Sequence, residues 1–253
     1  MLKIAFLMGL VLMMAACSTK TGPAEAYKDE TPRQIFEGAE ADMLKGSYSD
    51  AIKRFEALEV QYPLEKEAEL AEIHLVYAYY RKEDYALAEA AATRFIQVYP
   101  TSQHTAYIYL LKGLSDYYQE QGVLDRLFSI DLAKRDLEPL RKAFFDFSAL
   151  VDNFPNSPYA PAAYQYMVYL RNLMAKHQFQ LAQFYNERKA YVATIDRATL
   201  LVTHYQGAPV IPEALVLMAQ AYQKLHLTQQ QQEVIDLLQY NYPDSSYLKE
   251  ARG

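Results

Sequence analysis

The sequence predicts an all-α protein, built as a right-handed superhelical array of about five similar helix pairs. Apolar residues recur with helical spacing along most of the chain, and an aromatic-proline pair closes most of these stretches. No stretch alternates with period two for long enough to form a strand. The array is expected to cover residues 31–253 of the 253-residue chain, with N-terminal repeats at about 31–155 and C-terminal repeats at about 156–253.

Aromatic-proline pairs mark the expected helix ends. Proline cannot continue a helix, and it also disfavours helical geometry at the residue before it. The anchors are spaced by 37, 55, 51 and 37 residues. Two units are therefore near the ~34-residue period of tetratricopeptide repeats, and two carry roughly 20 extra residues. The anchors are Tyr62-Pro63, Tyr99-Pro100, Phe154-Pro155, the degenerate Tyr205 and Tyr242-Pro243.

A second alignment marks the start of each second helix. A large residue stands fourteen positions before each of the first four anchors, and in three units an alanine follows it by three. The pattern Gly46-x-Tyr48-x-x-Ala51 resembles the turn and second-helix start of a tetratricopeptide unit. The large residue fills the gap between helices, and the alanine allows close approach of their backbones. The aligned residues are Tyr48, Tyr85, Leu140 and Tyr191, with Ala51, Ala88 and Ala143.

Local signals predict where several helices begin. Residues 31–34 (Thr-Pro-Arg-Gln) predict a capping box with proline at the first helical position, and residues 228–231 (Thr-Gln-Gln-Gln) predict another capping box. Ser157-Pro158 predicts a third start of the same kind. Nothing interrupts the helical pattern from Pro158 to about Arg188, which predicts one long helix. Further first helices are expected over 67–82 and 103–121.

The helical stripes leave some side chains on outward faces. Tyr79 and Tyr109 fall opposite the stripes of their helices, whereas the anchor Tyr99 is expected to be largely buried. The chain has 23 tyrosines and no tryptophan. Surplus surface tyrosine suits protein binding, because the ring is amphipathic and loses little entropy when fixed; a plain surface role is the alternative. Acidic residues expected on a solvated face are Glu65, Glu67, Glu69 and Glu72.

The N-terminus has the pattern of a lipoprotein signal peptide over residues 1–16. Lys3 supplies the positive region, and a short apolar run to Met14 follows it. Residues 14–17 (Met-Ala-Ala-Cys) resemble a lipobox, and Cys17 is the only cysteine. Cys17 is therefore expected to carry a covalent lipid, with residues 17–30 as a flexible tether. Ser18 favours the outer membrane by resemblance to the bacterial sorting rule; an ordinary secretory signal with an incidental cysteine is the alternative.

Composition disfavours several functions. The formal net charge is −6, which argues against nonspecific nucleic-acid binding and against membrane contact beyond a lipid anchor. No glycine-rich phosphate loop occurs, and the histidines lack metal-ligand spacing. We therefore expect no catalytic residues, no metal and no cofactor besides the lipid on Cys17. The histidines, of which His74 is expected to pack in a core, are His74, His104, His177, His204 and His226.

Together, the lipobox, the helix pairs and the two long middle units resemble the BamD/ComL family of outer-membrane protein assembly lipoproteins. The resemblance covers about residues 31–245. It includes the insertion at 125–138 (DRLFSIDLAKRDLE). The other segments that carry it are 75–80 (LVYAYY), 94–96 (RFI), 112–114 (KGL), 145–151 (FDFSALV), 154–157 (FPNS), 185–188 (YNER) and Asp196-Arg197.

This resemblance implies a non-catalytic subunit of the complex that folds β-barrel proteins into the outer membrane, lipid-anchored on the periplasmic face. Its partners would be the barrel-forming assembly protein, contacted through its periplasmic domain, accessory assembly lipoproteins and unfolded outer-membrane protein substrates. The resemblance places partner contacts at Arg188, Asp196 and Arg197, and substrate contact at Tyr62. Arg197 lies six residues after Tyr191, which rotates it out of the apolar stripe and predicts an exposed or rim position.

Two other functions fit parts of this pattern. One is a different periplasmic tetratricopeptide lipoprotein that scaffolds cell-wall enzymes. The other is an α-superhelical transglycosylase, which would need an appended lysozyme-like domain with a catalytic glutamate. The repeats use the sequence up to Pro243, and ten residues follow it. We therefore expect no such domain.

Overall fold

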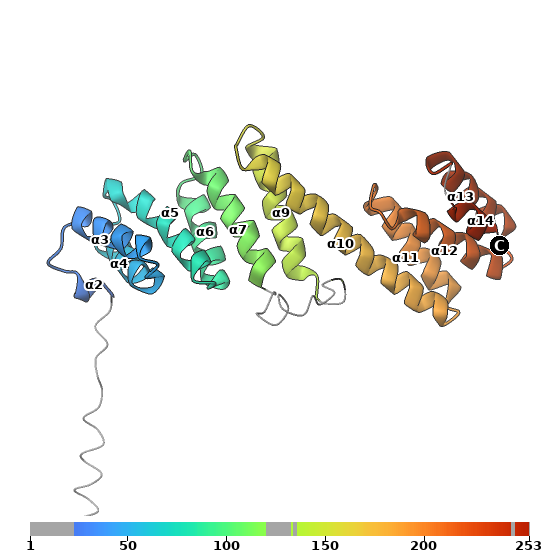
Figure 1. The fold of residues 1–253 in the computed structure, drawn as a ribbon, viewed down its shortest axis with the longest axis horizontal. Helices are drawn as coiled ribbons and strands as arrows, with labels where there is room; N and C mark the ends of the chain where they lie inside the picture. Colours follow the sequence, from blue (N-terminus) through green and yellow to red (C-terminus); the bar gives the residue numbers. More distant parts are fainter. Residues whose placement is uncertain (1–22, 120–132, 134–135, 244–245, 253) are drawn as a thin grey trace, which may run out of the picture. The chain divides into compact units, whose positions relative to one another are not determined.

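The structure, a computed structural model, describes residues 23–119, 133, 136–243 and 246–252. Within these residues the regular elements are helices and no strand occurs, so the all-α prediction is confirmed. Consecutive helices within 32–81, and likewise within 85–252, pack against each other as pairs (Figure 1). The handedness of the superhelix stays a prediction. The chain divides into two compact units, Met1–Asp84 (unit 1) and Tyr85–Gly253 (unit 2), so the division expected near residue 155 lies inside unit 2.

Unit 1 packs its helices around a small apolar core. Phe55, Leu58 and Val76 are completely buried there. The capping box at Thr31 is confirmed: its side chain accepts a hydrogen bond from the Gln34 backbone N–H, and the Gln34 side chain accepts one from the Thr31 backbone N–H. The helices are α2 (Pro23–Ala26), α3 (Pro32–Leu44), α4 (Tyr48–Gln61) and α5 (Lys66–Arg81).

In unit 2, the long helix predicted after Pro158 contributes to two apolar clusters. In α10, Leu170 and Met174 belong to one cluster and Ala175 to the other. Tyr205 packs against both clusters. The helices are α6 (Tyr85–Val98), α7 (Thr105–Gln119), α9 (Glu138–Asn153), α10 (Ala160–Glu187), α11 (Tyr191–His204), α12 (Ile211–Lys224), α13 (Thr228–Asn241) and α14 (Tyr247–Arg252).

The repeat register is confirmed at the ends of the second helices and at three of the four aligned starts. Tyr48, Tyr85 and Tyr191 are the first residues of α4, α6 and α11, whereas Leu140 is the third residue of α9; the aligned alanines are completely buried. Each of the five aromatic anchors directly follows the last residue of a helix. The backbone N–H of each anchor donates to the carbonyl four residues earlier, which completes the last helical turn before the chain leaves the helix.

Four equivalent turns share one unusual backbone conformation. Gly46, Glu83, Lys189 and His226 all have φ between 59° and 76°. Each stands two residues before a second helix starts. Only the first of these positions holds the glycine that accepts a left-handed conformation without steric penalty. The turn is therefore set by the helix pairing and not by glycine alone.

Two of the predicted helix starts are wrong in detail. Thr228 is not an N-cap: α13 begins one residue earlier than the capping box requires, and Leu227 stands at the N-cap without a side-chain hydrogen bond. The backbone N–H of Gln231 donates to the Leu227 carbonyl instead. The helix expected at Ser157-Pro158 begins at Ala160, because Ser157 accepts the backbone N–H of Tyr159 in a turn.

Burial differs from the expected stripes in α5 and α7. Tyr79 and Glu72 are buried, not exposed, because α5 packs against both α3 and α4 and so has more than one covered face. Burial and the Glu56 carboxylate, to which the Tyr79 hydroxyl donates, raise the pKa of Tyr79. Tyr109 is half-buried beside Phe154. Tyr99 is likewise only half-buried.

Candidate partner-binding site

The candidate site lies where the end of α10 meets α11, and it is built first on Arg188. This residue directly follows the last residue of α10. Its guanidinium carbon lies 3.5 Å from the centre of the Phe184 ring, and its Nη1 donates to the Phe184 carbonyl at 3.3 Å. A cation is favoured at the carbonyl end of a helix, and a planar guanidinium stacks well on an aromatic face. Arg188 is therefore held in place while staying exposed.

Arg197 lines a small cavity next to this stack. The cavity has a volume of about 220 Å³ and is lined by Tyr185, Ala193, Asp196, Arg197 and Leu200. Arg197 is partly exposed, as its rotation on the helix predicts. Its Nη1 makes a long hydrogen bond of 3.5 Å to the side-chain oxygen of Gln178 on α10. A neutral amide orients the guanidinium without cancelling its charge.

Asp196 is the exposed acidic member of the same cavity. The sequence left open a local ion pair between Asp196 and Arg197. Among the residues that the structure describes, no carboxylate lies within ion-pair distance of Arg197. The structure thus brings Asp196 and Arg197 together without pairing them. We call the residues 184, 185, 188, 196 and 197 the α10–α11 surface.

The aromatic part of the α10–α11 surface was not among the predicted site residues. Phe184 is 45% exposed, and its ring meets the Tyr185 ring edge-on at a centroid distance of 5.5 Å. Phe184 and Tyr185 are adjacent on a helix, and adjacent side chains point in different directions, so both cannot face one core stripe. The sequence therefore already indicated that one of these rings lies outside the core. A partly exposed ring stacked by a guanidinium is typical of interface anchors, in which aromatic residues and arginine are enriched.

Tyr62, the predicted substrate contact, lies in unit 1. It directly follows the last residue of α4, and its hydroxyl donates to the Glu30 carbonyl at 3.1 Å. Tyr62 is half-buried and ties the segment before α3 to α4. Two exposed aliphatic side chains flank it in sequence: Leu64 is 98% exposed and Val60 is 71% exposed. The packing contact is observed, and substrate contact stays a prediction.

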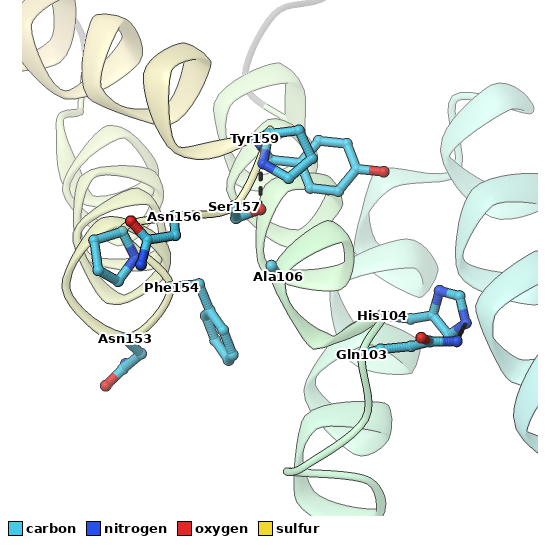
Figure 2. A pocket seen from close by; sticks show the side chains of 10 residues that line it. Gln103, His104, Ala106, Asn153, Phe154, Asn156, Ser157 and Tyr159 are labelled. Atoms are coloured by element: carbon cyan, nitrogen blue, oxygen red, sulfur yellow. Dashed lines mark hydrogen bonds between the residues drawn. The ribbon is translucent and has the colours of Figure 1, made fainter.

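A larger cavity of about 580 Å³ lies between the loop before α7 and the loop joining α9 to α10 (Figure 2). Both loops contain the same local turn. Ser102 accepts the backbone N–H of His104 at 3.1 Å, and Ser157 accepts that of Tyr159 at 3.2 Å. Apart from His104, the lining contains only uncharged side chains. We assign it no role.

The predicted lipid anchor Cys17 lies outside the described residues. Within the described residues, no helix is both long and apolar enough to cross a membrane. The same part of the chain contains no group of three or more histidine, cysteine, aspartate or glutamate residues placed to hold a metal ion.

Comparisons with known proteins place these features in a family. The model of the YfiO family, described as outer membrane lipoprotein, matches residues 28–238. The outer membrane protein assembly factor BamD of Vibrio cholerae is 32% identical over 240 residues, which are 95% of this chain and 99% of that protein. BamD of Pasteurella multocida is 32% identical and covers 86% of this chain and 84% of its own length.

BamD of Neisseria meningitidis serogroup A is 31% identical over 99% of this chain and 95% of its own length. The matched residues 28–238 include Tyr62, the α10–α11 surface and most of the predicted repeats. The chain therefore belongs to the BamD family of outer-membrane protein assembly lipoproteins.

Proposed function

We propose that this protein is a non-catalytic, protein-binding subunit of the outer-membrane β-barrel assembly complex. It binds the barrel-forming assembly protein through that protein's periplasmic domain, together with accessory lipoproteins. It is anchored in the outer membrane by a lipid on Cys17, with its repeats on the periplasmic side. Family membership and the names of the relatives support this proposal. The structural observation that carries it is the oriented Arg197 guanidinium, which has no acidic partner among the described residues.

The α10–α11 surface suits a partner that presents a carboxylate beside an apolar group. Arg197 offers a guanidinium that binds a carboxylate through two parallel hydrogen bonds. The stacked pair of Phe184 and Arg188 offers an aromatic edge and a second cation. Asp196 fixes the register, because it repels a misplaced carboxylate and attracts a basic group of the partner.

In unit 1, we propose that substrate segments contact the region of Tyr62. The exposed Leu64 and Val60 support this role, because unfolded barrel segments carry apolar side chains that such residues can cover. A packing role for Tyr62 alone is the alternative. A photo-crosslinker at position 62 is expected to capture substrate during barrel assembly. Failure to capture any in an otherwise functional protein contradicts the substrate role.

The function is tested by extracting the protein from outer membranes with detergent and identifying the proteins that copurify. The wild-type protein is expected in the outer-membrane fraction and to bring down the barrel-forming protein. Arg197→Glu is expected to fold normally by circular dichroism and to reduce this association at least about tenfold, since truncating one partner of a desolvated charge pair costs ~2–5 kcal/mol.

Arg141→Glu is the matched control. Arg141 is an exposed arginine of α9 in the same unit, and its Nη1 lies 3.6 Å from Glu138. This control is expected to keep the association. Unchanged copurification of Arg197→Glu removes Arg197 from the interface. Copurification of cell-wall enzymes in place of the barrel complex favours the scaffold alternative, and a soluble wild-type protein contradicts the lipid anchor.

A further inference from the structure

Two segments singled out by the sequence, residues 112–114 and 145–151, meet where α7 crosses α9. A Cβ atom on Gly113 would lie 2.7 Å from the ring of Phe147, which is completely buried. Glycine is thus required for this close approach. The side chains on either side of the contact carry charges, and the function proposed above does not use them.

Four charged or ionisable side chains gather at this crossing. The Lys112 ammonium lies 2.7 Å from Asp146 of α9 and 3.4 Å from Glu89 of α6. Asp116, one turn after Lys112 on α7, is only 2% exposed. Its Oδ2 and the Oδ2 of Asp146 are both buried without a hydrogen-bond partner among the described residues, and the two carboxyl groups act on each other. The titratable groups that act on Asp116 are Asp146 of α9, Glu89 of α6 and Lys112 of α7 itself. In unit 2, α6 and α9 are the helices that pack against α7.

The charges in this cluster do not balance if every carboxyl group is ionised. Three carboxylates would then face a single ammonium group. An ionised carboxylate can only accept hydrogen bonds, so a hydrogen bond between Asp116 and Asp146 requires a proton on one of them. Two buried carboxylates in contact do not both ionise readily, because each desolvates and repels the other. Asp146 already accepts a hydrogen bond from the Lys112 ammonium at 2.7 Å, so the proton of the pair is assigned to Asp116.

We propose that Asp116 and Asp146 form a buried proton-binding site that fastens α7 to α9. The proton resides on Asp116, which donates it in a hydrogen bond to Asp146. Asp146 is then a carboxylate that accepts from Asp116 on one side and from Lys112 on the other. Loss of this proton breaks the bond and leaves two negative charges in contact at the closest approach of the two helices.

The electrostatics agree with this geometry. Burial, followed by the hydrogen bond to Asp146, raises the pKa of Asp116 to about 7. Because this pKa is higher in the folded protein than in the unfolded chain, the folded state binds the proton more tightly. The proton on Asp116 contributes fully to the free energy of unfolding below the ordinary aspartate pKa. This contribution falls as the pH rises through the pKa of about 7 and is lost at higher pH. The contact between α7 and α9 that this proton stabilises therefore weakens at neutral pH.

The full chain and Asp116→Asn are compared by urea unfolding at about pH 5.5 and about pH 8.5, a window chosen around the pKa shift. The wild-type midpoint is expected to fall as the pH rises. The asparagine variant is expected to lose most of this fall, because its side-chain amide donates to Asp146 at either pH and carries no charge. Equal pH dependence in both proteins overturns the proposal.

The matched control is Asp50→Asn. Asp50 is an exposed aspartate whose pKa is lowered by its hydrogen bond to Lys53, so it stays ionised across this window. That variant is expected to keep the wild-type pH dependence. The carbon-13 resonance of the Asp116 carboxyl group in the wild-type protein gives a second readout that does not depend on the variant folding. Titration near 7 supports the site, and titration near 4 overturns it.

Discussion

Each unit holds one basic side chain between two carboxylates, but the two arrangements differ in their access to water. In unit 1, the Arg54 guanidinium lies 3.0 Å from Glu30 and 3.2 Å from Asp42, and it covers the Tyr27 ring at 4.6 Å. Water reaches all three charged groups, since each side chain is at least 21% exposed. One cation beside two carboxylates is tolerated there because solvent screens the excess charge.

In unit 2, Lys112 stands between Glu89 and Asp146, and the almost fully buried Asp116 adds a third carboxyl group. Solvent screens charge poorly at Asp116 and Asp146, which are 2% and 8% exposed, so a proton on this pair neutralises the excess. The comparison therefore predicts that burial, rather than the number of charges, decides whether such a cluster binds a proton. They also predict different responses to loss of the cation.

The largest effect is expected from Lys112→Met. Removal of the cation leaves buried carboxylates without compensation, which typically costs about 3–5 kcal/mol. Urea unfolding at neutral pH measures this loss, which is expected to shrink at low pH as the carboxyl groups take up protons. Arg54→Met in unit 1 is the matched variant and is expected to cost only about 1 kcal/mol, because its partners are partly exposed. Equal losses contradict the contrast between the units.

The sequence predicted those features of the fold that depend on local chemistry. Aromatic-proline pairs end helices wherever they occur, and Tyr48, Tyr85 and Tyr191 start helices as aligned. Among the four equivalent turns, a glycine marked only the one at Gly46 in the sequence. Lys189 and its equivalents adopt the same left-handed conformation without a glycine. Those positions are set by helix pairing, which a single segment does not reveal.

Burial was predicted less well, because it depends on contacts between distant segments. A single apolar stripe leaves Tyr79 and Glu72 outside, whereas α5 is covered on two sides by α3 and α4. At the candidate site, rotation along α11 predicted the partial exposure of Arg197, but not its contact with Gln178. The charge cluster was not foreseen, since Asp116 and Asp146 lie on different helices.

A smaller difference in the free energy of unfolding is expected between alanine substitutions at two helical glycines, Gly38 in unit 1 and Gly113 in unit 2. Each glycine lies near the charge cluster of its unit. Replacing glycine by alanine inside a helix gains ~1 kcal/mol of intrinsic propensity. At Gly38 of α3, the new Cβ atom would meet only the end of the Arg54 side chain, at 2.9 Å. That side chain is flexible and can shift, which weakens its partly exposed ion pairs and offsets part of the propensity gain. Gly38→Ala is therefore expected to change the free energy of unfolding by less than about 0.5 kcal/mol.

At Gly113, the new atom would meet the buried Phe147 ring at 2.7 Å, and that ring has no room to move. Overpacking of this kind costs ~1–3 kcal/mol, so Gly113→Ala is expected to destabilise by roughly 1 kcal/mol net of the propensity gain. Urea unfolding of both variants measures the difference. Phe147→Leu in the Gly113→Ala background is expected to relieve the clash, so the double variant loses less than the sum of the single losses. Additive losses would place the effect of Gly113 outside its contact with Phe147.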